Sequence, residues 1–125
     1  MATLNSFNYL ELHSTAPEAA RSFYTALFGW KTEEKPVPAE KPFTYVEIAT
    51  EGGPAGLLPQ FQPGAPSHWL AYVSVPDLDA ATAKAKALGG RVVKERTEVG
   101  NEGAFVVLLD PSGASIGLWQ SLAAR

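Results

Sequence analysis

Residues 75–90, VPDLDAATAKAKALGG, decide the fold. The stretch before them, residues 69–75, is typical of a β-strand. Asp77 can then cap a helix, because its side chain can accept a hydrogen bond from the first turn. Apolar residues recur through that helix at three- and four-residue steps, and Gly89-Gly90 stands where a helix normally ends. The stretch therefore predicts a strand followed directly by a helix.

The same pattern occurs earlier in the chain without a gap. Gly29 aligns with Gly90, a shift of 61 residues, and the register then holds to the last strand. Residues 7–13 alternate with the period of two that is typical of a strand. Residues 15–18 predict a capping box, with Pro17 in the first helical turn, where its missing N–H is harmless. A repeat in one register predicts two copies of one structural unit.

Short β-type runs separated by turn residues follow each helix. They lie at residues 30–33, 43–49, 55–59, 91–95, 104–109 and 115–119. Asp110-Pro111-Ser112-Gly113 fits a type I turn and predicts a hairpin of the last two strands, and Gly52-Gly53-Pro54 does the same in the first copy. The expected fold is α+β, with two tandem βαβββ modules.

Composition limits the classes of function. The 125 residues, 46% of them hydrophobic, fit a single domain, 1–125, with module one at about 5–59, a linker at about 59–66 and module two at about 67–122. A net charge of -3 argues against nucleic acid or a membrane surface as partner. There is no cysteine, so a metal would need His, Asp or Glu. No signal peptide or membrane span is recognisable, and we expect a cytoplasmic protein. Nucleotide-binding and serine-hydrolase motifs are also missing from the sequence.

Four short motifs in order carry a family resemblance. They are FYTALFGW at residues 23–30, VPDLDAA at 75–81, LGG at 88–90 and DPSG at 110–113. With the tandem repeat, they resemble the vicinal oxygen chelate superfamily, which includes glyoxalase I, extradiol dioxygenases and bleomycin resistance proteins. The resemblance implies a curved, U-shaped mixed sheet around a cavity with the helices outside, commonly in a homodimer.

The resemblance also implies where a metal would be held. Metalloenzymes of this superfamily place ligands on the first and last strands of each module, and those positions fall on Tyr9, Gly56, Leu70 and Gly117. Glycine and leucine have no donor atom, and a tyrosine phenol with a pKa near about 10 is a poor ligand at neutral pH. We therefore expect no metal cofactor, with a divalent metal as the alternative.

The opening strand combines apolar and polar residues in alternation. Tyr9, Glu11 and His13 share one face, and Leu10 and Leu12 share the other, because successive side chains point to opposite sides of a strand. If the leucines pack on the helices, the polar trio faces the cavity. A carboxylate there needs solvent or a partner, and His13 is two residues away.

The second module adds further candidates. Tyr72 and Ser74 are expected on the cavity face, with Trp119 on the last strand. The predicted ligand-binding residues are therefore Tyr9, Glu11, His13, Tyr72, Ser74 and Trp119. The three aromatic residues are equally consistent with core or dimer-interface packing. His68 is predicted as a surface or loop histidine.

Three classes of function stay open at this point. The first is a protein that binds a small aromatic or amphipathic molecule in a metal-free cup. The second is a lyase, isomerase or dioxygenase with Glu11 and His13 as its catalytic acid and base, or as an incomplete metal site. The third is a non-catalytic regulatory or interaction subunit. The expected partners are a small-molecule ligand and a second copy of the chain.

Overall fold

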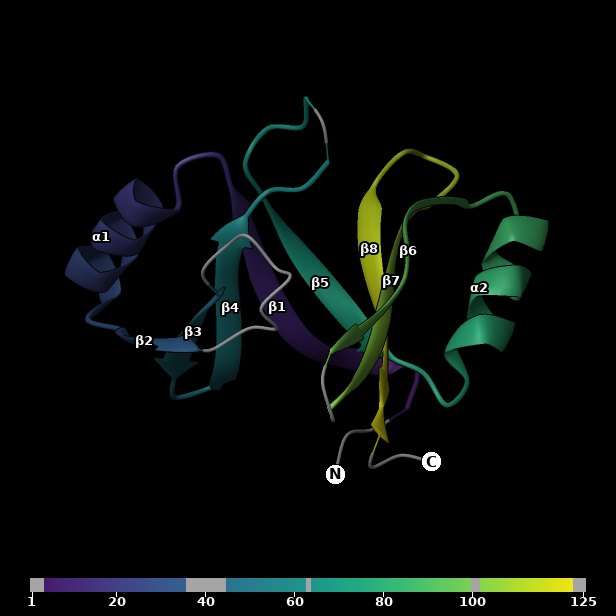
Figure 1. Ribbon diagram of the computed structural model, residues 1–125, viewed down its shortest axis with the longest axis horizontal. Helices are drawn as coiled ribbons and strands as arrows, with labels where there is room; N and C mark the ends of the chain where they lie inside the picture. Colours follow the sequence, from purple (N-terminus) through teal and green to yellow (C-terminus); the bar gives the residue numbers. More distant parts are fainter. Residues whose placement is uncertain (1–3, 36–44, 63, 100–101, 123–125) are drawn as a thin grey trace. The chain divides into compact units, whose positions relative to one another are not determined.

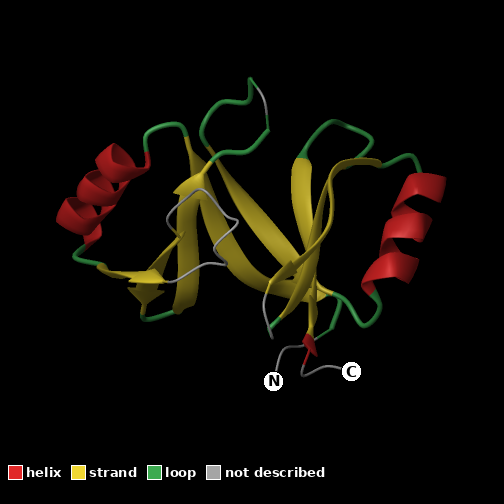
Figure 2. Cartoon of the chain, viewed as in Figure 1, coloured by secondary structure: helices red, strands yellow, loops and turns green. Residues whose placement is uncertain are grey.

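The computed structural model describes residues 4–35, 45–62, 64–99 and 102–122. Within these residues the chain forms a strand, a helix and three strands, and then repeats that order (Figure 1). Figure 2 colours helices, strands and loops by type. The predicted α+β class and the tandem βαβββ order are confirmed. The strand predicted at residues 43–49 begins at Phe43 and Thr44, which lie outside the described residues, and it is observed from Tyr45 onward.

The chain divides into two compact units. One is Tyr9–Leu70, and the other joins Met1–Asn8 to Ala71–Arg125. The boundaries fall inside the strands β1 (Ser6–Ser14) and β5 (His68–Ser74). Each unit has its own helix and its own hydrophobic core. We call them the Tyr9–Leu70 unit and the Ala71–Arg125 unit.

The Tyr9–Leu70 unit places its opening strand beside its closing strand. Its further elements are α1 (Pro17–Phe28), β2 (Lys31–Lys35), β3 (Tyr45–Thr50) and β4 (Gly53–Pro59). The strand order is β2-β3-β4-β1, with β1 parallel to β4 and the other pairs antiparallel. In this register Glu11 lies beside Gly56. The core consists of Leu12, Val46, Ile48, Ala55 and Leu57.

The Ala71–Arg125 unit repeats this arrangement. Its elements besides β5 are α2 (Leu78–Ala87), β6 (Arg91–Val99), β7 (Gly103–Leu109) and β8 (Ser115–Ser121). Its strand order is β5-β8-β7-β6, and β5 runs parallel to β8. Asp110 caps the predicted turn between β7 and β8 with its carboxylate, which accepts hydrogen bonds from the Ser112 and Ala114 amides at 2.8 and 3.0 Å. The predicted hairpin of the last two strands is confirmed.

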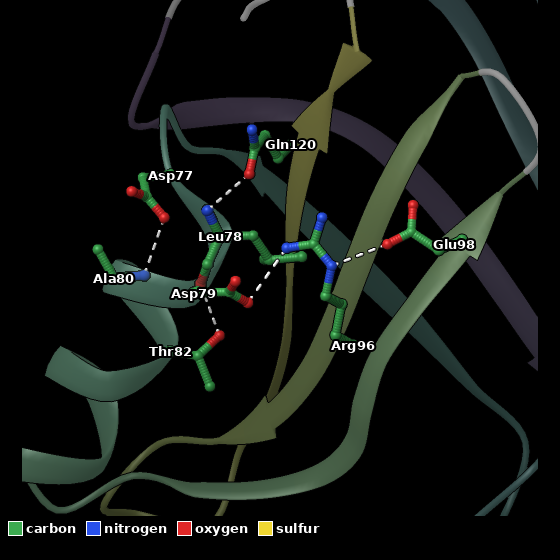
Figure 3. A network of polar contacts seen from close by, with 8 residues as sticks. All are labelled: Asp77, Leu78, Asp79, Ala80, Thr82, Arg96, Glu98 and Gln120. Atoms are coloured by element: carbon green, nitrogen blue, oxygen red, sulfur yellow. Dashed lines mark hydrogen bonds and ion pairs between the residues drawn. The ribbon is translucent and has the colours of Figure 1, made fainter.

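Side-chain hydrogen bonds fix the start of α2 (Figure 3). Asp77 Oδ1 accepts from the Ala80 amide at 3.0 Å, as the sequence predicted. Gln120 Oε1, from β8, accepts from the Leu78 amide at 2.8 Å. Because the first amides of a helix have no partner inside the helix, both bonds stabilise its first turn.

Two local predictions in the first module are wrong. The capping box at residues 15–18 does not form, because Ala16 is the N-cap and Thr15 bonds to Ser67 instead, with 3.2 Å between the two hydroxyl oxygens. Leu10 does not pack on the helix and is 52% exposed, whereas Leu12 on the same face lies in the core. The helix end is as expected, since Gly29 adopts the left-handed conformation with φ 70°.

Candidate functional site

Two buried ionisable residues on β1 are hydrogen-bonded to each other. Glu11 is 8% exposed and His13 is fully buried. His13 Nε2 lies 2.8 Å from Glu11 Oε1. An ionised carboxylate only accepts, so His13 Nε2 carries the hydrogen and donates it. In the neutral ring, Nδ1 is then left with a free lone pair.

Two tyrosines extend this contact into a chain of hydrogen bonds. The Tyr45 hydroxyl, from β3, donates to Glu11 Oε2 at 3.0 Å. Since that hydrogen is used, the Tyr9 hydroxyl donates to the Tyr45 oxygen. Burial raises the pKa of Tyr45, and the negative charge of Glu11 raises it further. The phenol therefore stays protonated and serves as a permanent donor to the carboxylate.

Glycine makes room for a tyrosine ring in each unit. A Cβ on Gly56 would lie 2.0 Å from the Tyr45 hydroxyl oxygen and 2.9 Å from that of Tyr9. A Cβ on Gly117 would lie 2.3 Å from Cδ1 of Tyr72. The aromatic side chains thus occupy the space that a longer side chain at either glycine would need.

The residues at the superfamily's metal positions do not fit a divalent metal. Gly56 and Gly117 offer no donor atom, and tyrosine rings fill the adjacent space. Leu70 is a fully buried aliphatic side chain, and the Tyr9 hydroxyl already bonds to Tyr45. This mismatch follows from the chemistry of the four side chains, and we derive no reaction step through a metal held there.

His68 lies next to the buried His13. The two ring centroids are 5.2 Å apart, with an angle of 64° between the planes. Phe61 contacts the same histidine, with a centroid distance of 4.7 Å. His68 was predicted as a surface or loop residue, but it is half-buried and is the first residue of β5. Its Nδ1 donates to the Pro66 carbonyl at 2.8 Å.

Buried polar atoms without a hydrogen-bond partner gather in this unit. Among the described residues they are His13 Nδ1, Gln60 Oε1, Gln62 Nε2 and His68 Nε2. His13 contacts both Phe61 and His68, and Gln60 and Gln62 are the sequence neighbours of Phe61. We call His13, Phe61 and His68 the His13 cluster. An unsatisfied buried polar atom costs about 1–3 kcal/mol, so a bound water, ion or ligand would stabilise the cluster.

The three other predicted site residues lie in the Ala71–Arg125 unit. Tyr72 is buried, and its ring meets the edge of Phe105 at a centroid distance of 6.0 Å. Ser74 is also buried, and its hydroxyl has no hydrogen-bond partner among the described residues. Trp119 is half-buried, and its ring lies close to Gly103. Tyr9, Glu11 and His13 thus form one connected network in the Tyr9–Leu70 unit. Tyr72, Ser74 and Trp119 lie in the Ala71–Arg125 unit.

The sequence did not single out Tyr45, Gln60, Gln62 or His68 as site residues, although residues 43–45 could line a wall of the first module and residues 59–66 could form the rim of a cleft. Tyr45 lies in a predicted strand, but only the pairing of β3 with β4 and of β4 with β1 brings it to Glu11, 34 positions away. Gln60 and Gln62 belong to the predicted linker. Alternation of polar and apolar residues in 43–49 could have assigned Tyr45 to one face of its strand. It could not have shown that this face lies beside Glu11.

Two further properties of the chain concern metal binding and membrane insertion. In the part of the chain that the structure describes, no three His, Cys, Asp or Glu side chains are grouped so as to hold a metal ion. Neither of the two described helices has the length and apolar character to cross a membrane.

Comparison with known proteins gives relatives for most of the chain. The chain is 35% identical over 118 residues to the protein named "Putative glyoxylase CFP32" of Mycobacterium tuberculosis, and 27% identical over 127 residues to "Anthracycline biosynthesis protein DauV" of Streptomyces sp.. These alignments cover 91% and 90% of this chain but only 45% and 46% of the relatives. The chain therefore spans about half the length of the curated relatives it matches.

Solved structures share the fold at low sequence identity. The methylmalonyl-CoA epimerase from Mycobacterium tuberculosis has a TM-score of 0.67 and 18% identity, with 100% of this chain and 97% of that chain covered. A methylmalonyl-CoA epimerase in complex with methylmalonyl-CoA and NH4+ has a TM-score of 0.63 and 19% identity, with 98% and 99% covered.

A family model decides the classification. The model of the Glyoxalase/Bleomycin resistance protein/Dioxygenase superfamily matches residues 6–118, which is nearly the whole chain. The repeat, the βαβββ modules and the fold of the epimerases agree with that match. The chain belongs to the Glyoxalase/Bleomycin resistance protein/Dioxygenase superfamily.

Proposed function

We propose that the chain binds a small organic molecule at the His13 cluster, without a metal at the superfamily's four positions. The observation that carries the proposal is that the neighbouring rings of His13 and His68 each have a buried nitrogen without a hydrogen-bond partner among the described residues. Their burial costs free energy that a ligand with matching donors and acceptors would recover. Small-molecule sites typically combine apolar walls with a few such polar groups.

The chemistry of the cluster restricts the ligand. In the neutral rings His13 Nδ1 and His68 Nε2 accept hydrogen bonds, so the ligand must donate at two positions. The Phe61 ring supplies an apolar surface beside His13. A hydroxylated aromatic compound meets both requirements. The name of the Streptomyces relative, an anthracycline biosynthesis protein, is consistent with a ligand of this kind.

Calorimetric titration with a panel of hydroxylated aromatic compounds tests the binding proposal. We expect saturable binding in the presence of a chelator and at least about tenfold weaker binding by Glu11→Gln, because that change alters how His13 is held. Glu47→Gln is the matched control, since Glu47 also lies beside Gly56 but its side chain is 43% exposed and pairs with Lys35. Equal loss of affinity in both variants, or no binding by the parent, contradicts the proposal.

Proton transfer is a second candidate function. It is favoured by the Glu11–His13 contact, in which the carboxylate orients the ring and leaves Nδ1 free to accept a proton. Epimerases with this fold are named for a substrate that is a CoA ester, and a putative glyoxylase is among the relatives. An isomerase acting on a carbon next to a carbonyl would need one such base.

Turnover assays separate the two candidates. The assay measures exchange of a carbon-bound hydrogen for deuterium in a bound carbonyl compound. Exchange that is insensitive to chelator, and that falls about 100-fold or more in Glu11→Gln, supports proton transfer. Saturable binding without any hydrogen exchange contradicts proton transfer and supports the binding function only.

We also propose that two copies of the chain associate. The apolar residues Phe23 and Leu27 on α1 are 59% and 58% exposed, and α1 has no buried residue. A second copy covering this helix would remove that apolar surface from water.

A further inference from the structure

We propose that His13 and His68 form a binding site for one transition-metal ion, Cu²⁺ or Zn²⁺, with His13 Nδ1 and His68 Nε2 as its protein ligands. The inference goes beyond the proposed function, because the occupant is a cation and not an organic molecule. It also uses none of the four superfamily positions, Tyr9, Gly56, Leu70 and Gly117.

Both rings are held in the way that metal-binding histidines are held. His13 Nε2 donates to the Glu11 carboxylate at 2.8 Å, and His68 Nδ1 donates to the Pro66 carbonyl at 2.8 Å. Ligating histidines almost always donate their second ring N–H to a carboxylate, a backbone carbonyl or water. In the neutral rings these two bonds fix the tautomers, and each ring then has one nitrogen with a lone pair.

The two remaining nitrogens are buried and have no partner. His13 Nδ1 and His68 Nε2 make no hydrogen bond to any described residue. A lone pair in this state has lost its contact with water and gained nothing in return. A cation would satisfy both nitrogens at once.

The spacing of the rings matches a shared ion. Two imidazoles bound to one tetrahedral ion at about 2.0–2.1 Å have ring centroids about 5 Å apart. A water molecule bridging the same nitrogens at about 2.9 Å would place the centroids about 6.5 Å apart. The observed separation is 5.2 Å. This separation is close to the one expected for a shared ion, and it also lies in the ordinary range of an edge-to-face ring pair.

The ligand type selects the metal. Imidazole nitrogens suit Cu²⁺ and Zn²⁺, and Cu²⁺ binds most tightly among the divalent first-row ions. Within the described residues no third His, Cys, Asp or Glu completes the group, so water would fill the other coordination positions. With only two protein ligands the affinity of the site would be moderate.

Copper binding measured by electron paramagnetic resonance tests the inference directly. The chain contains only two histidines, so in protein without a histidine tag imidazole coupling arises from His13 and His68 alone. We expect one Cu²⁺ per chain, coupled to two imidazole nitrogens. His68→Phe should show one nitrogen and bind at least about tenfold more weakly.

Two further variants complete the test. Glu11→Gln should weaken Cu²⁺ binding by about 10–100-fold while circular dichroism shows an unchanged fold, because only the group that orients His13 is altered. Glu51→Gln, an exposed carboxylate of the same unit, should bind as the parent does. A parent spectrum with fewer than two imidazole nitrogens, or equal weakening in Glu51→Gln, overturns the site. No organic ligand is present, so this result is independent of the proposed binding function.

Discussion

Gly56 determines how Tyr45 reaches Glu11. The Tyr45 hydroxyl lies where a side chain at position 56 would begin, and the neighbouring Tyr9 hydroxyl is almost as close. The phenol pair and the carboxylate can therefore form one hydrogen-bonded chain only if position 56 has no side chain. A residue without any functional group thus shapes the chemistry around Glu11.

Replacing Gly56 by alanine should destabilise the protein. The added Cβ would meet the Tyr45 oxygen at 2.0 Å, and overpacking of this kind costs about 1–3 kcal/mol. Gly52→Ala is the matched control, because its Cβ meets no atom closer than 3.9 Å, and we expect a change within about 0.5 kcal/mol. Urea unfolding of both variants measures the difference. Equal stabilities would show that Tyr45 does not occupy this space.

The buried phenol of Tyr45 should make stability pH-dependent in alkaline solution. Burial, and then the charge of Glu11, raise the pKa of Tyr45 in the folded protein. The unfolded chain loses this proton near pH 10, whereas the folded chain keeps it. Between the two pKa values the free energy of unfolding therefore falls as pH rises, by at most about 1.4 kcal/mol per pH unit.

The comparison with Tyr45→Phe isolates this effect. Urea unfolding from about pH 9 to pH 11 should give a steeper decline for the parent than for Tyr45→Phe. Below the pKa that Tyr45 has in the unfolded chain, its phenol is protonated in both states of the parent and adds no pH dependence to the free energy of unfolding. Tyr45→Phe has no phenol at this position. Identical slopes across the range would mean that Tyr45 ionises as readily in the folded state as in the unfolded state.

Alternation along β1 predicted which residues lie together, but it could not predict their partners. Tyr9, Glu11 and His13 share a face because a strand has a period of two, and the observed hydrogen bonds connect them through Tyr45. The contact with Tyr45 depends on strand pairing across the unit. The placement of His68 depends equally on tertiary structure, which a local pattern does not contain.

At the scale of elements, the two helices begin differently. α2 has Asp77 as N-cap, whereas α1 begins at Ala16 without a side-chain cap. The sequence suggested a cap in both modules, and it failed for α1 because Thr15 bonds to Ser67 across the unit. Helix extents and turns were predicted well, since they depend on local signals such as Pro17 and the Asp110 turn.

The α2 cap should make a measurable contribution to stability. Asp77→Ala removes the acceptor for the Ala80 amide and should lower the free energy of unfolding by about 1 kcal/mol. Asp77→Asn keeps an acceptor oxygen and should be nearly neutral. Thermal unfolding followed by circular dichroism compares the two. If Asn and Ala are equally destabilising, the negative charge and not the cap is responsible.

The exposed face of α1 leads to a prediction about assembly. Introducing charge with the double variant Phe23→Glu and Leu27→Glu should convert a dimer into a monomer, because two carboxylates would be buried in the apolar contact. Ser22→Glu is the control on the same helix. Light scattering coupled to size-exclusion chromatography reports the mass. A parent that is monomeric, or a double variant that stays dimeric, contradicts association through α1.

At the scale of the whole molecule, the fold was easier to predict than the function. The repeat fixed the order of elements because each copy carries the same local signals 61 residues apart, as at Gly29 and Gly90. Function depends on a few side chains that differ among proteins of one fold. The curated relatives are about twice as long as the part that aligns with this chain. The activity of a whole relative therefore does not transfer directly to this chain.

Nuclear magnetic resonance of the histidine ring nitrogens tests the proposed function most directly. The protein is titrated with hydroxylated aromatic compounds in the presence of a chelator, and the ¹⁵N shifts of both histidine rings are followed. Binding at the His13 cluster predicts saturable shifts of His13 Nδ1 and His68 Nε2. Saturation of the protein without a change at either ring, or binding that is seen only when the chelator is left out, would contradict the account.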